Sequence, residues 1–181
     1  MPNTPTTSLA TIHGLAERVA AYRALDLLLF EVIGAWITDS TAANLRPYYA
    51  AWSQHHSWHA DLWAGRFPVI PDLELETATE RASERFTAVR AVFLASDANA
   101  DTHTDAQRIR LLAAELLPQL EAILVEHRAN VVPEFDAPTA RVLDLVLDDV
   151  RRDAAMARQL VPTTDSDRDR PSPIDISTLF G

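Results

Sequence analysis

Cysteine is absent from the sequence, and glycine occurs only four times in 181 residues. The lack of cysteine excludes disulfides, thiolate catalysis, cysteine-ligated zinc and iron–sulfur clusters, so any bound metal ion must have nitrogen and oxygen ligands. The few glycines exclude a P-loop and a dinucleotide-binding fingerprint. They also favour helices, because glycine costs about 1 kcal/mol relative to alanine in a helix.

Long hydrophobic runs are lacking as well. No segment approaches the roughly 20 consecutive apolar residues of a membrane span, and residues 1–8 have neither the basic start nor the apolar stretch of a signal peptide. We therefore expect a cytoplasmic protein that does not enter a membrane.

Basic residues are outnumbered by acidic residues, and the formal net charge is −10 at pH 7. This charge argues against nucleic acid as a partner, because phosphate binding needs clustered lysine and arginine.

The sequence does contain clear helical periodicity. Apolar residues recur at spacings of three and four, which predicts helices over about residues 8–37, 41–65, 74–94, 104–131 and 139–161, with a kink at Pro118. Short connections make neighbouring helices antiparallel, so we expect an all-α, antiparallel four-helix bundle with an additional crossover helix at 74–94. The chain then divides into a flexible N-terminus (1–8), a helical bundle (9–161) and a flexible C-terminal tail (162–181).

Three polar residues interrupt the apolar stripes of the first two helices, namely Asp26, His56 and His59, and His55 lies next to them in the sequence. Asp26 precedes the turn near residue 40 by about as many residues as His55 follows it, so both lie at the same height in an antiparallel pair. Imidazoles one helical turn apart, such as His56 and His59, could bind one ion together with an oxygen of Asp26. His55 and His59 are also one turn apart. The alternative is a buried polar network in which His59 is hydrogen-bonded to Asp26.

The second hairpin carries further charged candidates. Glu121 lies about as far before the turn near Glu134 as Asp148 and Asp149 lie after it, which mirrors the first hairpin and makes Asp148 a candidate pocket residue. Arg152 is a candidate pocket residue too, although an arginine in the bundle centre would repel a metal cation and favour an internal Asp–Arg pair. The alternative for these charges is an ordinary solvated face.

Aromatic residues gather on the same hairpin as the histidines. Tyr22, Trp52 and Trp63 fall on its apolar stripes and could line a substrate pocket. The alternative is that their large rings only fill the space between the helices.

Two runs of the first hairpin carry a resemblance. The first is Tyr22-Arg23-Ala24-Leu25-Asp26, continued by Leu29-Phe30-Glu31 and Gly34-Ala35-Trp36. The second is His55-His56-Ser57-Trp58-His59-Ala60-Asp61-Leu62-Trp63. These runs resemble the ferritin-like superfamily, in particular small, poorly characterised actinobacterial ferritin-like proteins. In that superfamily two helices each give a lone glutamate and two give Glu-x-x-His, which together bind two irons inside the bundle. The resemblance implies that Asp26 replaces the first lone carboxylate, His56-x-x-His59 the first Glu-x-x-His, and Glu121 the second lone glutamate.

On the second hairpin, Asp148-x-x-Arg151 or Asp149-x-x-Arg152 stands where the second Glu-x-x-His would be. Because His and Arg replace bridging carboxylates, a site for one metal ion fits better than a di-iron centre. The first hypothesis is a ferritin-like protein that binds one Fe or Zn ion, as a metal-dependent oxidoreductase of the mononuclear oxidase or oxygenase type. The alternative is a metal-free ferritin-like module that binds a small molecule or a partner protein. A homodimer is compatible with both hypotheses.

The C-terminal tail regains apolar residues after a polar linker, namely Ile174, Ile176, Leu179 and Phe180. This pattern resembles the short peptides that pack some ferritin-like proteins into encapsulin shells, and it predicts an encapsulin shell as a partner. The alternative is a segment that folds back onto the bundle.

Overall fold

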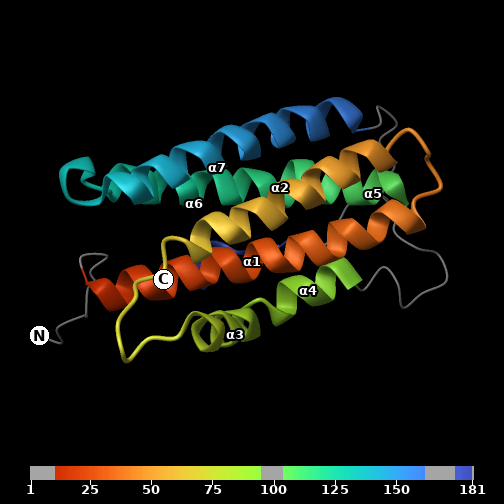
Figure 1. Ribbon diagram of the computed structural model, residues 1–181. Helices are drawn as coiled ribbons and strands as arrows, with labels where there is room; N and C mark the ends of the chain where they lie inside the picture. Colours follow the sequence, from red (N-terminus) through yellow and green to blue (C-terminus); the bar gives the residue numbers. More distant parts are fainter. Residues whose placement is uncertain (1–10, 95–103, 162–173, 181) are drawn as a thin grey trace, which may run out of the picture.

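The computed structural model describes residues 11–94, 104–161 and 174–180, and these residues form helices and no strand (Figure 1). The elements in chain order are α1 (Ile12–Asp39), α2 (Arg46–Ala64), α3 (Leu75–Arg85), α4 (Thr87–Leu94), α5 (Asp105–Arg110), the π-helical η1 (Leu111–Leu116), α6 (Leu117–Asn130), α7 (Pro133–Leu160) and the 3-10 helix η3 (Ser177–Phe180). The all-α class is confirmed. The expected flexible N-terminus (1–8) and residues 162–173 of the expected tail lie outside the described residues.

The long helices lie side by side in two antiparallel hairpins (Figure 1). Helix α1 packs along α2, α6 packs along α7, and α2 contacts α7 between the hairpins. Helices α3 and α4 cover the other side of α1. None of the described helices is long and apolar enough to cross a membrane.

Local sequence explains how the first hairpin forms. The side chain of Thr11 caps α1 by accepting a hydrogen bond from the Gly14 amide. Helix α2 has a proline in its first turn, where backbone amides have no partner within the helix, so the amide hydrogen that proline lacks is not missed. Gly34 faces α2, where an added β-carbon would lie only 3.2 Å from Ser53 Oγ. The absence of a side chain at Gly34 therefore lets the two helices approach closely.

Several helices are less regular than their periodicity predicts. The helix expected over 74–94 is interrupted at Phe86, whose φ of −90° and ψ of 7° separate α3 from α4. Where the sequence predicts a kink, at Pro118, the structure has the π-helical segment η1, which lies just before this residue. The wider π-helical turns lead up to a proline that has no amide hydrogen to donate to the preceding turn. Helix α7 begins at Pro133, earlier than expected, with a non-helical residue at Asp136.

The described part of the C-terminal tail folds back onto the helices. Ile174, Ile176 and Phe180 are buried in the main hydrophobic core. The Gln119 amide on α6 donates to the Ile174 carbonyl and accepts from the Ile176 amide, at 2.6 and 3.1 Å. This arrangement corresponds to the alternative in which the segment packs against its own chain.

Candidate metal centre

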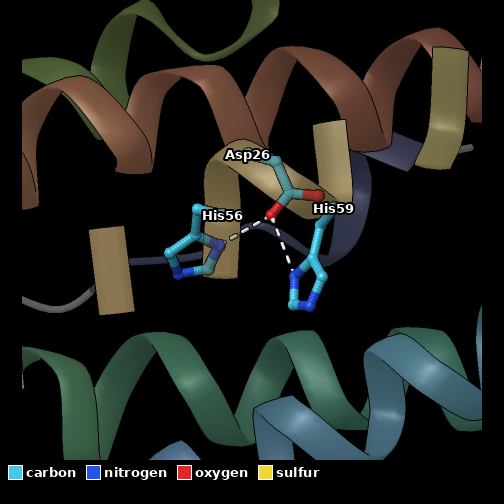
Figure 2. Close-up of side chains that lie close together, drawn as sticks. All are labelled: Asp26, His56 and His59. Atoms are coloured by element: carbon cyan, nitrogen blue, oxygen red, sulfur yellow. Dashed lines mark hydrogen bonds and ion pairs between the residues drawn. The ribbon is translucent and has the colours of Figure 1, made fainter. Parts of the chain in front are cut away.

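Asp26 lies near the middle of α1, and its carboxylate is almost completely enclosed. It is 4% exposed and accepts two hydrogen bonds from α2, from His56 Nδ1 at 2.7 Å and from Trp63 Nε1 at 2.9 Å. Figure 2 shows the carboxylate pointing from α1 towards the two histidines, which in turn point towards α6 and α7. The antiparallel pairing of α1 with α2 places these side chains at one level.

His59 is the second imidazole next to this carboxylate. It is 1% exposed, and its Nδ1 lies 3.8 Å from Asp26 Oδ1, which is an ion-pair distance but too long for a hydrogen bond. Nδ1 has no hydrogen-bond partner, whereas Nε2 lies 3.2 Å from Asp149 Oδ2 on α7. His59 therefore contacts carboxylates of both hairpins, and one of its nitrogens is buried without a partner.

The electrostatics of the group favour positive charge beside Asp26. Burial, the largest influence, acts to raise the pKa of Asp26, but the hydrogen bond from His56 and the nearby imidazoles of His56 and His59 outweigh it and hold that pKa below its ordinary value. Burial acts to lower the pKa of His59, yet Asp26 and Asp149 outweigh it, so that pKa lies above its ordinary value. Two buried carboxylates thus draw a cation to this place, whether a proton or a metal ion.

Asp26, His56 and His59 form a buried group that could hold a metal ion. Each offers one ligand atom, and the three atoms lie within 4.8 Å of one another. Ligands about 2.0–2.1 Å from a metal ion lie about 3.0–3.4 Å from one another. The distances from Asp26 Oδ1 to the two imidazoles, 2.7 and 3.8 Å, lie on either side of that range. In a metal-bound form His59 Nδ1 would move closer to the carboxylate, and the hydrogen that His56 Nδ1 donates to Asp26 would have to leave that nitrogen.

The remaining predicted metal ligands do not join this group. His55 Nδ1 bonds to Asp153 Oδ2 at 2.8 Å, near the surface of the interface between α2 and α7. Glu121 forms an ion pair with Arg151 at 2.7 Å. The alternative of a hydrogen bond between His59 and Asp26 is not formed, because His59 Nδ1 lies 3.8 Å from Asp26 Oδ1, and the carboxylate accepts from His56 and Trp63 instead.

The predicted pocket residues separate into two sets. Trp63 donates to Asp26, and Tyr22 stacks on the Trp63 ring with centroids 4.6 Å apart, so both adjoin the group. Trp52 packs edge-on against Tyr49 instead. Asp148 and Arg152 bond to each other at the surface, where their side chains are 72% and 60% exposed, and Arg152 also donates to Asp149.

Sequence reasoning did not pair His55 and His59 with carboxylates of the second hairpin, and it did not consider Asp153 at all. Asp149 and Asp153 are both buried on α7 and bond to His59 and His55, respectively. The available signal was their spacing of four residues, which matches the spacing of His55 and His59 on the facing helix.

Fold and site together define an all-helical protein with a buried group of two imidazoles and one carboxylate. Comparison with known proteins adds no family to this description. The chain matches no family model, and no curated protein or solved structure matches it.

Proposed function

We propose that this protein binds one divalent transition-metal ion through Asp26, His56 and His59. The observation that carries the proposal is the unpartnered Nδ1 of His59, buried and directed at a carboxylate 3.8 Å away. A buried nitrogen without a hydrogen bond is costly, by about 1–3 kcal/mol, and a cation between Nδ1 and Asp26 would remove that cost. The charge supports this, since Asp26 and Asp149 both favour a cation at His59.

We further propose that the ion is Fe or Zn and that the protein is an oxidoreductase of the mononuclear oxidase or oxygenase type. Two imidazoles and one carboxylate are the ligand set of non-haem Fe(II) oxygenases, and histidine with carboxylate is also common around catalytic zinc. Three protein ligands leave positions free for water, O₂ or a substrate, where a bound ion acts as a Lewis acid or redox centre. The antiparallel hairpins and the resemblance of the first hairpin support a ferritin-like assignment within the same proposal.

The residues around the group have separate tasks in this proposal. Trp63 holds one oxygen of Asp26 and leaves the other facing the two imidazoles. The stacked Tyr22 ring closes the far side of Trp63. Because all three proposed ligands are at most 4% exposed, bulk water is excluded, which strengthens charge interactions inside the site.

A second function is favoured by the hydrogen bonds of Asp26. Its carboxylate already accepts from His56 and Trp63, so both oxygens are satisfied by the protein alone. In a metal-free module of this kind, the group would be a polar part of the core and the protein would act by binding a small molecule or a partner. Here the unpartnered His59 Nδ1 would need a proton directed towards Asp26.

The metal content of purified protein separates the two functions. We suggest expression with iron or zinc, purification without chelators, and elemental mass spectrometry on wild type, His59→Ala and His55→Ala. His55 is the matched control, because it lies one turn away on α2 and also bonds to a buried aspartate of α7. Circular dichroism checks that each variant is folded, and His56→Gln serves as a second ligand variant.

About one equivalent of metal in wild type and in His55→Ala, lost in His59→Ala and His56→Gln, would support the proposed site. Equal metal content in all folded variants would place the ion elsewhere. Wild-type protein that contains no metal, even after reconstitution with Fe(II) or Zn(II), would favour the metal-free module.

A further inference from the structure

We propose that Asp149, on the second hairpin, is a positioning residue that fixes which nitrogen of His59 binds the ion. The proposal rests on the metal site of the first hairpin proposed above. It assigns a function to a helix that supplies none of the three proposed ligands, since Asp149 belongs to α7 whereas the ligands belong to α1 and α2.

Asp149 is well placed to hold a proton on His59. Its Oδ2 lies 3.2 Å from His59 Nε2, and it is itself buried. Its other oxygen, Oδ1, accepts a hydrogen bond from Arg152 at 2.8 Å, which fixes the orientation of the carboxylate. A carboxylate oxygen accepts hydrogen bonds, so the hydrogen of the contact with His59 lies on Nε2.

A proton on Nε2 determines the state of the other nitrogen. In the neutral imidazole, which is the form that binds a metal ion, one nitrogen carries hydrogen and the other a lone pair, so a hydrogen held on Nε2 by Asp149 leaves the lone pair on Nδ1. Nδ1 is the nitrogen that faces Asp26 and has no partner in the protein. Asp149 thus directs the lone pair into the proposed site and makes His59 a stronger ligand, as hydrogen-bonded carboxylates do for other metal-bound histidines.

The neighbouring pair of His55 and Asp153 provides a matched control. It joins the same two helices, has a similar contact at 2.8 Å, and contains a buried aspartate. Its histidine, however, does not belong to the group that could hold an ion. Removal of Asp153 should therefore disturb the interface of α2 with α7 without changing the orientation of a metal ligand.

The first test is titration of the full chain with Co(II), followed by its visible absorption, for wild type, Asp149→Ala and Asp153→Ala. We expect Asp149→Ala to weaken Co(II) binding by about 10–100-fold, the usual effect of losing such a carboxylate. Asp153→Ala should keep the wild-type affinity. If Asp149→Ala does not fold, Asp149→Asn replaces it, with a smaller loss expected because the amide oxygen still accepts from Nε2.

The second test reads the histidine nitrogens directly. Long-range ¹H–¹⁵N NMR spectra of the Zn(II)-bound protein should show His59 coordinated through Nδ1 and protonated at Nε2. Coordination through Nε2, or equal Co(II) affinity in Asp149→Ala and wild type, would overturn the assignment of Asp149 while leaving the metal site intact. If wild type binds neither Co(II) nor Zn(II), the proposed function itself fails and Asp149 has no ion to position.

Discussion

His127 on α6 is a buried imidazole whose titration should make the protein less stable at mildly acidic pH. It is 3% exposed, and its Nδ1 lies 3.1 Å from the hydroxyl of Tyr22. Burial and the positive charge of Arg18 lower its pKa from 6.5 to about 4, against a smaller opposite effect of Asp136. Burial also raises the pKa of Tyr22, so the phenol keeps its proton and donates it to a neutral Nδ1.

The sign of the effect follows from the two states of the chain. The folded protein keeps His127 neutral until the pH approaches 4, whereas the unfolded chain takes up a proton as the pH falls below 6.5. Between these values the unfolded state binds more protons, so acidification favours unfolding. With these two pKa values, the free energy of unfolding should fall by about 2 kcal/mol between pH 7 and pH 5 on account of His127 alone.

Urea unfolding followed by circular dichroism at pH 7 and pH 5 measures this contribution. The comparison variant is His127→Gln, whose amide oxygen can still accept from Tyr22 but does not titrate. Wild type should lose about 2 kcal/mol more than the variant on acidification. The other titrating groups, including His55 and His59, are common to both proteins and cancel in the difference. Equal losses in the two proteins would refute the argument.

Three further predictions concern the metal site and the C-terminal segment. Zn(II) at 100 times its Kd should raise the free energy of unfolding by about 2.7 kcal/mol, and EDTA should reverse the gain. A melting temperature that changes with neither addition would contradict the metal site. Trp63→Phe keeps a ring but removes the donor to Asp26, so urea unfolding should show a loss of about 1–3 kcal/mol, and an unchanged midpoint would mean that this hydrogen bond does not stabilise the fold. Gln119→Ala should speed amide hydrogen exchange in residues 174–180 relative to the exposed control Gln54→Ala, unless the apolar side chains alone hold that segment.

The long helices were predictable because a buried apolar stripe must recur with the period of the helix. Helices α1 and α2 begin and end within a turn or so of the predicted residues. The interruptions were not predictable in the same way, because they keep apolar residues facing inwards. Phe86 ends α3 yet is buried, and it packs edge-on against Phe180 with ring centroids 5.7 Å apart. A periodicity argument does not detect a break that preserves the buried face.

The level of the candidate site along the helix axes was predictable, but the direction in which each side chain points around its helix was not. Counting residues from the turn placed Asp26 level with the histidines, and the structure brings it to 2.7 Å from His56. Neighbours on a helix point about 100° apart, so His55 turns away from this group towards α7. Which histidine meets which carboxylate depends on the packing of α2 against α7, and the sequence of one hairpin contains no information on the position of the other.

The two histidine–aspartate pairs between α2 and α7 also determine how the hairpins align. His55 and His59 are four residues apart, as are their partners Asp153 and Asp149. A slip of one turn between the helices would leave one buried carboxylate without its hydrogen bond, at a cost of about 1–3 kcal/mol in addition to the lost packing. The pairs therefore favour the observed register of α2 against α7, and residues beside the proposed ion help to align the two hairpins.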